Sequence, residues 1–149
     1  MLETKIDQDI KQAMLGGDKP RAEVLRGLKS ALLNEKIAKG LRETGLSDEA
    51  VLVIVGREVK KRLESADLYR QAGANDRAEA EEAEKAIIEA YLPAQLADDE
   101  LAKVVEDTAK ELGDAAQMGQ IIGAVRQKVG ASADGGRIAA AVKQHLEHK

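Results

Sequence analysis

The chain has 149 residues, a net charge of −4 and no cysteine, phenylalanine or tryptophan. The lack of cysteine excludes a disulfide framework and thiolate chemistry, and the negative total argues against a general nucleic-acid binder that relies on whole-chain attraction to phosphate. An apolar share of 44% with only two tyrosines predicts a core of aliphatic side chains.

The first part of the chain predicts helices, because apolar residues recur at helical spacing and no stretch alternates as a strand would. The first helix runs from about Leu2 to Leu15 and stops at Gly16-Gly17. The second begins after Asp18, a good N-cap, has Pro20 in its first turn and ends near Gly40.

A third helix starts at Ser47, whose hydroxyl is expected to cap it, and reaches Tyr69 before Gly73. A fourth starts near Asn75 and ends at Leu92-Pro93, because the residue before a proline avoids helical geometry. The positions predicted to face inward in the second to fourth helices are Val24, Leu25, Leu28, Leu32, Ile37, Leu52, Val55, Val59, Leu63, Ala66, Ala80, Ala83, Ile87 and Tyr91.

Pro93-Ala94-Gln95-Leu96-Ala97 is the predicted domain boundary, and three shorter helices follow it. They run from Asp98 to Gly113, from Met118 to Gly130, and onward from Asp134. Their predicted inward residues are Leu101, Val104, Val105, Leu112, Met118, Ile121, Ile122, Val125, Val129, Ile138, Val142 and Leu146. The predicted fold is therefore all-α, with an N-terminal four-helix part (1–93) and a small C-terminal three-helix bundle (94–149).

Basic residues are unevenly distributed. From Lys19 to Arg42 there are seven basic residues and two acidic ones, and Lys60-Lys61 lies in a second basic stretch. One interpretation is that these side chains lie on solvated helix faces and form pairs at i,i+4 spacing. The alternative is a patch for structured RNA or an acidic partner, which needs no aromatic platforms. The residues of this candidate basic face are Arg21, Arg26, Lys29, Lys36, Lys60 and Lys61.

No motif for catalysis or cofactor binding is found. None of the four serines has a G-x-S-x-G context, and the glycine pairs fit neither a P-loop nor a dinucleotide fingerprint. His145 shares the inward face with Val142 and is expected to be a partly buried core residue, and no metal-ligand set accompanies His148. We therefore predict no catalytic residue, no metal and no cofactor.

The segment from Gly130 to Arg137 is the motif with the clearest binding potential. It places small residues and free amides at the start of the last helix, where the helix dipole favours an anion such as an RNA phosphate. The alternative is that Asp134 occupies those amides as an ordinary N-cap. The candidate tRNA- or phosphate-binding residues are Arg126, Lys128, Gly135, Gly136, Arg137 and Lys143.

A set of short segments extends almost from end to end of the chain: Lys11-Gln12-Ala13-Met14, Val24-Leu25-Arg26, Asn34-Glu35, Arg57-Glu58-Val59-Lys60-Lys61-Arg62, Tyr69-Arg70-Gln71-Ala72-Gly73, Tyr91-Leu92-Pro93-Ala94-Gln95-Leu96, Met118-Gly119 and Ala133-Asp134-Gly135. In this order and spacing they resemble the YqeY family of bacterial proteins. YqeY proteins have two helical domains and are similar to the tail of GatB, a subunit of the tRNA-dependent amidotransferase whose tail contacts tRNA. Where relatives often carry Lys or Arg before Ala-Asp-Gly, this chain has Gly130-Ala131-Ser132.

The resemblance implies a non-catalytic module that binds tRNA or assists a tRNA-dependent amidotransferase, and the absence of cysteine suggests a cytoplasmic location. A second reading is an adaptor that binds the amidotransferase or another protein and no nucleic acid. A third is the glutamine-dependent carbon–nitrogen ligase activity with which the family is often labelled, although the chain has neither the ATP-binding fold nor the amidase serines. The N-terminus is charged from Glu3 onward and no apolar run reaches membrane length, so we expect no membrane partner.

Overall fold

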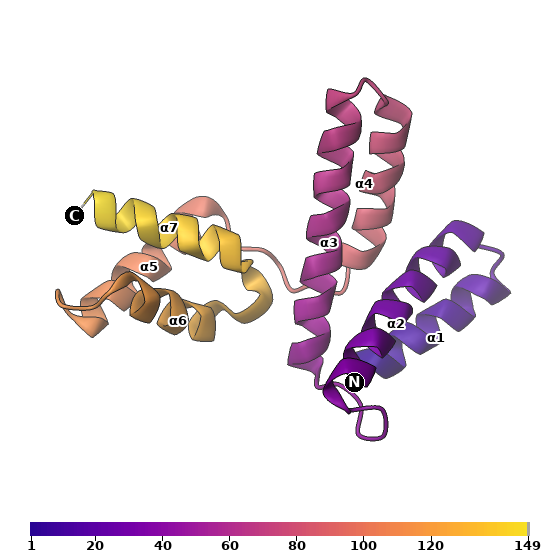
Figure 1. Cartoon of the computed structure of the whole chain (residues 1–149), viewed down its shortest axis with the longest axis horizontal. Coiled ribbons are helices and arrows are strands. Elements are labelled where there is room, and N and C mark those ends of the chain that lie inside the picture. The colour runs from indigo at the N-terminus through magenta and orange to yellow at the C-terminus, as the bar shows by residue number, and fades with distance from the viewer. Residues whose placement is uncertain (149) are drawn as a thin grey trace. The chain divides into compact units, whose positions relative to one another are not determined.

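A computed structural model describes residues 1–148, which contain helices and no strand, so the predicted all-α fold class is confirmed (Figure 1). The chain divides into two compact units, one spanning Met1–Leu92 and the other beginning at Pro93. The first unit holds α1 (Leu2–Leu15), α2 (Lys19–Lys39), α3 (Asp48–Gln71) and α4 (Asn75–Glu89). The second holds α5 (Asp98–Leu112), α6 (Met118–Val129), the 3-10 turn η1 (Gly130–Ser132) and α7 (Gly135–Glu147). None of the helices in the described residues is long and apolar enough to cross a membrane.

The starts of α2 and α3 are fixed by the side chains that the sequence predicts as caps. The Asp18 carboxylate accepts a hydrogen bond from the Arg21 amide at 3.2 Å, and the Ser47 hydroxyl accepts one from the Ala50 amide at 3.2 Å. Each bond satisfies an amide that has no partner inside its helix. α2 ends at Gly40, whose φ of 68° lies in the left-handed region that favours glycine.

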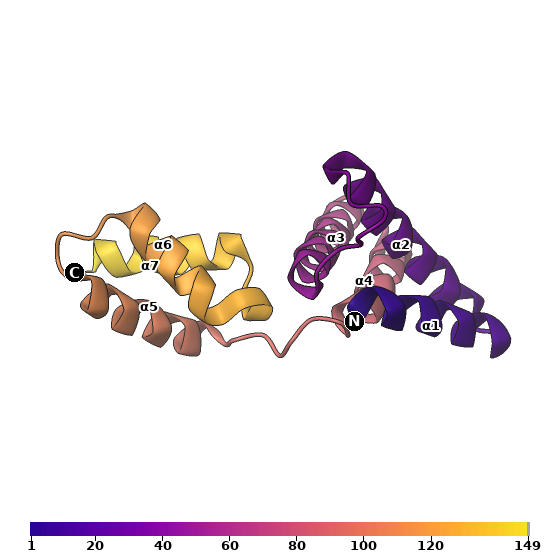
Figure 2. The same cartoon turned by 90° about the horizontal axis from the view of Figure 1, so that it is seen from below.

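Two helical hairpins form the first unit. α1 packs against α2 and α3 against α4, and the hairpins meet where α2 contacts both α3 and α4 (Figure 1, Figure 2). One apolar cluster joins them, and its fully buried members include Leu25 and Leu28 of α2, Val51 and Val55 of α3, and Ile88 of α4. As the composition predicts, aliphatic side chains build this core.

Several inward positions predicted for the first unit are wrong. Ile37 and Leu63 are 53% and 43% exposed, and Ala80 and Ala83 are also exposed. The apolar cluster extends along α3 only as far as Val59, so Leu63 lies beyond it. Most apolar residues of α4 are alanines, which give a weak periodic signal, so the sequence pattern did not identify the face of this helix that is buried.

The second half of the α3–α4 hairpin is held by small side chains and ion pairs. Ala66 and Ala78 are fully buried, and their methyl groups allow the two helices to approach closely. The Arg62 guanidinium lies 3.3 Å from the Glu84 carboxylate across the same seam. This stretch therefore buries little apolar surface, and it exposes Leu63 on α3.

The second unit is a small bundle in which α5, α6 and α7 contact one another. Its buried residues match most of the predicted inward positions and include Leu101, Val105, Ile121, Val125, Ile138 and Val142. Leu112 is an exception, because it is the last residue of α5 and is 45% exposed. Thr108, which periodicity did not place inward, is buried at 1% exposure.

The segment after Pro93 is hydrogen-bonded to η1 within the second unit. The Leu96 amide donates to the Ser132 carbonyl at 2.8 Å, and Gln95 Nε2 donates to the Ala131 carbonyl at 2.9 Å. The short stretch predicted from its proline as a domain boundary is thus held against η1, just before the start of α7.

Candidate nucleic-acid interface

The N-terminus of α7 is the centre of the candidate interface. Asp134 is its N-cap, and its carboxylate accepts a hydrogen bond from the Arg137 amide at 2.8 Å. Gly135 and Gly136 are the first two helical residues, and their amides have no hydrogen-bond acceptor within the described chain. Asp134 therefore uses one of the free amides, and two more remain at the positive end of the helix dipole.

Arg126 of α6 lies directly over Gly135. A Cβ atom added to Gly135 would stand 2.7 Å from Arg126 Nη2, so the glycine leaves the space that the guanidinium occupies. Arg126 is exposed, and no carboxylate among residues 1–148 pairs with it. An arginine without a counter-charge is therefore located at a helix N-terminus, where its positive charge adds to the dipole.

Lys143 extends this positive surface along α7. It is exposed, has no ion pair within the described residues and stands seven positions after Gly136. A spacing of seven places two residues on the same face of a helix. Of the six residues predicted to bind phosphate, Arg126, Gly135, Gly136 and Lys143 therefore remain available to a ligand.

Arg137 and Lys128 are engaged within the second unit. Arg137 Nη2 donates to the Leu96 carbonyl at 2.6 Å and to Asp98 Oδ1 at 2.9 Å, which fastens the start of α5 to α7. Lys128 Nζ lies 2.8 Å from Glu111 Oε2. The sequence did not predict that Arg137 joins the start of α5 to α7, because its partners lie about forty residues earlier in the chain.

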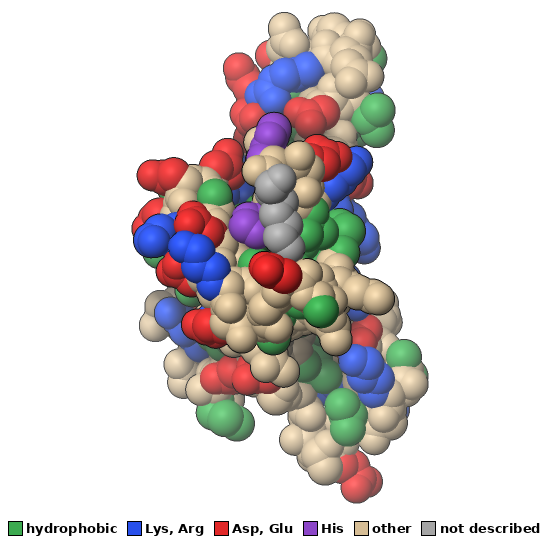
Figure 3. Space-filling model, turned by 90° about the vertical axis from the view of Figure 1, so that its left-hand side faces the viewer, with side chains coloured by type: hydrophobic (Ala, Val, Ile, Leu, Met, Phe, Trp, Pro, Cys, Tyr) green, Lys and Arg blue, Asp and Glu red, His purple; other side chains and the backbone are tan. Residues whose placement is uncertain are grey.

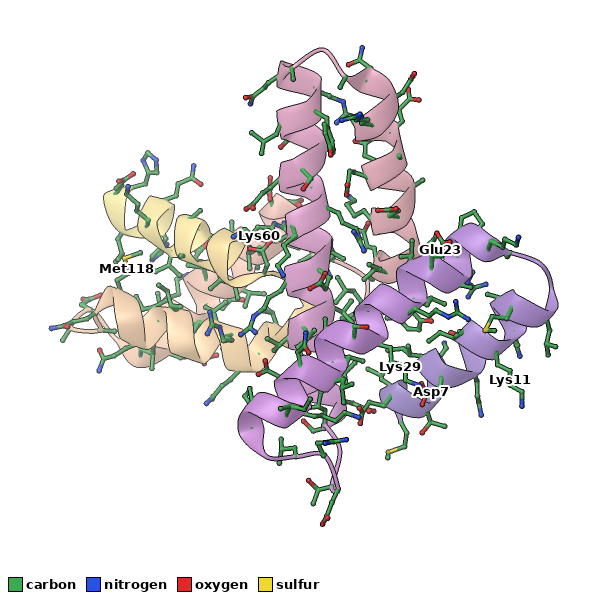
Figure 4. The ribbon with its side chains drawn as sticks, turned by 45° about the vertical axis from the view of Figure 1, so that its right-hand side comes forward. Asp7, Lys11, Glu23, Lys29, Lys60 and Met118 are labelled. Atoms are coloured by element: carbon green, nitrogen blue, oxygen red, sulfur yellow. The ribbon has the colours of Figure 1, made fainter. Side chains whose placement is uncertain are left out.

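The predicted second basic face in the first unit consists largely of paired side chains. Lys29 Nζ lies 2.8 Å from Asp7 Oδ1 (Figure 4). Lys36 Nζ lies 2.9 Å from Glu3 Oε1. These pairs join α2 to α1 and leave less positive charge for a ligand.

The other four members of that face differ among themselves. Arg26 donates to the Met14 sulfur at 3.0 Å, and Lys61 pairs with Glu58 at 3.3 Å. The positive charge of Arg21 partly offsets the rise in the pKa of Tyr91. Lys60 on α3 has no partner among the described residues (Figure 4). The sequence identified the basic residues, and the fold places acidic or polar partners beside most of them.

Four titratable groups in the first unit, Glu3, Glu35, Arg70 and Tyr91, have shifted pKa values. Glu3 and Tyr91 are the two whose hydrogen bonds join segments far apart in the sequence. Partial burial pushes the pKa of Glu3 upward, but hydrogen bonds from Lys36 and the Leu46 amide outweigh it and hold this pKa below its usual value. Burial, together with a 2.6 Å hydrogen bond to Asp9, raises the pKa of Tyr91.

No group of three His, Cys, Asp or Glu residues within 1–148 is arranged to hold a metal ion. The start of α7 combines two free amides, the helix dipole and an arginine without an ion pair among the described residues, which are groups of the kind that bind anions.

The family model described as Yqey-like protein matches residues 3–146, which is nearly the whole chain and includes every candidate residue named above. No curated protein matched the sequence.

Proposed function

Because the chain belongs to the YqeY-like family, we propose that it is a non-catalytic module that binds tRNA or assists a tRNA-dependent amidotransferase. The second unit carries the nucleic-acid contact in this proposal, and the phosphate backbone of the RNA is what it binds. The link to the amidotransferase rests on the resemblance between YqeY proteins and the tail of GatB.

The observation that carries the proposal is the unpaired Arg126 guanidinium over Gly135. Two free amides, the dipole of α7 and an arginine without a carboxylate partner converge on one point of the surface. Phosphate oxygens accept hydrogen bonds from amides and arginine, and structured RNA is recognised largely through its backbone and shape. Lys143 on the same helix supplies a further cation for a neighbouring phosphate.

The proposal is tested by measuring tRNA affinity of the nuclease-treated protein at two salt concentrations. We expect binding that weakens steeply with salt, because each phosphate contact releases counterions. The double variant Arg126→Glu, Lys143→Glu should lose about tenfold in affinity at low salt, and its salt slope should fall by about two.

A matched variant separates local contact from total charge. Lys11→Glu with Lys19→Glu makes the same charge change on exposed side chains of the first unit that have no ion pair within the described residues. If both double variants lose affinity equally, the start of α7 is not the contact. If the unmodified protein binds no tRNA at low salt, the RNA proposal itself is wrong.

A second candidate function is a protein adaptor, and one observation favours it. Leu33 and Ile37 on α2 are 42% and 53% exposed, and they stand four residues apart, so they share the outer face of that helix. The adaptor function would be supported by a protein that co-purifies with the chain after nuclease treatment and no longer co-purifies with the double variant Leu33→Ser, Ile37→Ser.

A further inference from the structure

A second concave surface of the second unit lies outside the phosphate site. It is a groove of about 430 Å³ between α5 and α7. Leu101, Ala102 and Ala141 line its apolar part, and Gln144, His145 and His148 contribute polar side chains from α7 and its end. The groove is open to solvent, and its lining combines apolar and polar groups that can contact a ligand lying on the surface.

The groove contains the only aromatic rings of the second unit. The chain has two tyrosines and two histidines, and both tyrosines belong to the first unit. Tyr91 is bound to Asp9, and the ring of Tyr69 is covered by Arg77. His145 and His148 stand three residues apart and both line the groove, and Figure 3 shows the histidine side chains on one face.

The polar groups of the groove suit the edge of a nucleobase. The Gln144 amide both donates and accepts hydrogen bonds, which is the pattern that a base edge presents. The short side chains of Ala102 on α5 and Ala141 on α7 leave room for a flat ring to approach the backbones of these helices. Asp98, the only carboxylate among the lining residues, is paired with Arg137 at 2.9 Å, so its repulsion of RNA is reduced.

We propose that this groove binds an unpaired nucleotide of an RNA ligand, with the base stacked on an imidazole and its edge hydrogen-bonded by Gln144. Imidazole rings serve as stacking partners for unstacked RNA bases. The inference rests on the proposed function, since it adds a base site to a surface that binds phosphate. From Arg137 to His148 the groove follows about 16 Å of helix, at 1.5 Å per residue.

The first experiment compares tRNA binding by the full chain with that of the triple variant Gln144→Ala, His145→Ala, His148→Ala, at pH 8 and two salt concentrations. We expect about a tenfold loss of affinity, the scale of one lost base-stacking contact, with the salt slope unchanged. Variants of Arg126 and Lys143 should instead reduce the slope, because they remove charge. The control is Gln127→Ala, an exposed glutamine of α6 outside the groove.

The outcomes distinguish the base site from the phosphate site. If the triple variant binds tRNA like the unmodified protein while the Arg126, Lys143 variant does not, the groove is no base site and the proposed function stands. A triple variant that loses helix content would leave affinity uninformative, so the second measurement uses the unmodified chain.

That measurement follows the histidine ring signals by NMR as a single-stranded RNA of six adenosines is added. Shifts of both rings, absent with an RNA duplex of equal length, support the base site even where tRNA binding fails. No shift at millimolar RNA would overturn it, and so would equal shifts with a glutamate hexapeptide, which would indicate a site for acidic protein.

Discussion

Glu3 and Asp7 stand four residues apart on α1 and pair with Lys36 and Lys29, which stand seven apart on α2. In an antiparallel hairpin these spacings bring both pairs into register, so each lysine meets its own carboxylate. Glu3 does more, because its second oxygen accepts a hydrogen bond from the Leu46 amide at 2.9 Å and so ties the α2–α3 loop to α1. One carboxylate therefore connects three segments of the first unit.

The lowered pKa of Glu3 predicts a dependence of stability on pH. A carboxyl with a depressed folded-state pKa stabilises the fold above its unfolded value, near 4.5, and this contribution is lost as pH falls through the folded value. Glu3→Gln should therefore lower the free energy of unfolding by about 1 kcal/mol at pH 7. The difference from the unmodified protein should shrink as the pH falls below 4.5 and vanish only below the lower, folded-state pKa of Glu3.

Urea unfolding at several pH values measures this difference. Glu23→Gln is the matched control, since Glu23 is an exposed glutamate of α2 without an ion pair among the described residues (Figure 4). If Glu3→Gln lowers the free energy of unfolding equally at neutral and at acidic pH, the loss comes from altered packing and not from the lost charge.

At the scale of elements, the contact between Arg126 of α6 and Gly135 of α7 predicts that one substitution affects stability and tRNA binding in opposite directions. Gly135 has no left-handed φ and lies in the first turn of α7, where alanine lowers the entropy of the unfolded chain. Gly135→Ala should therefore keep or raise stability, by up to about 1 kcal/mol. The new methyl group, however, would displace the flexible end of Arg126 and weaken tRNA binding.

Thermal melting and tRNA affinity, measured on the same samples, check this prediction. Gly119→Ala is the control, because Gly119 lies in the first turn of α6 and an added Cβ meets nothing within 4 Å. It should gain stability without loss of affinity. If Gly135→Ala binds tRNA as tightly as the unmodified protein, Arg126 is not part of the interface.

For the whole molecule, the division of the buried apolar residues into two clusters predicts that the two units unfold separately. One cluster includes Leu28 and Ile88, and the other includes Leu101 and Ile121. Ile121 is 2% exposed, so Ile121→Ala should cost about 2–5 kcal/mol in the second unit. Hydrogen exchange should accelerate at core amides of α5, α6 and α7 and stay unchanged in the first unit.

The reciprocal variant Leu28→Ala should accelerate exchange in the first unit alone, because Leu28 is fully buried in the first cluster. Equal acceleration in both units by either variant would show that the chain unfolds as one cooperative body. Separate unfolding of the two units would also allow tRNA affinity to be measured while the first unit is destabilised and the candidate interface stays folded.

By itself, the sequence determined the helices and their caps. Asp18, Ser47 and Asp134 act within three residues of themselves, so the signal that marks each helix start is local. In the second unit it also identified most of the buried face, because Leu, Ile and Val repeat there with a clear helical period. The family resemblance, carried by the order of short segments, is confirmed over residues 3–146.

Only the tertiary structure decided which charges remain available. Lys29 and Lys36 are paired with α1, Arg137 is bound to Leu96 and Asp98, and Arg126 lies unpaired over Gly135. It also decided which side of α4 is buried. The physical reason is that a cap acts through a nearby amide, whereas an ion pair or a buried face depends on elements that folding brings together from distant parts of the chain.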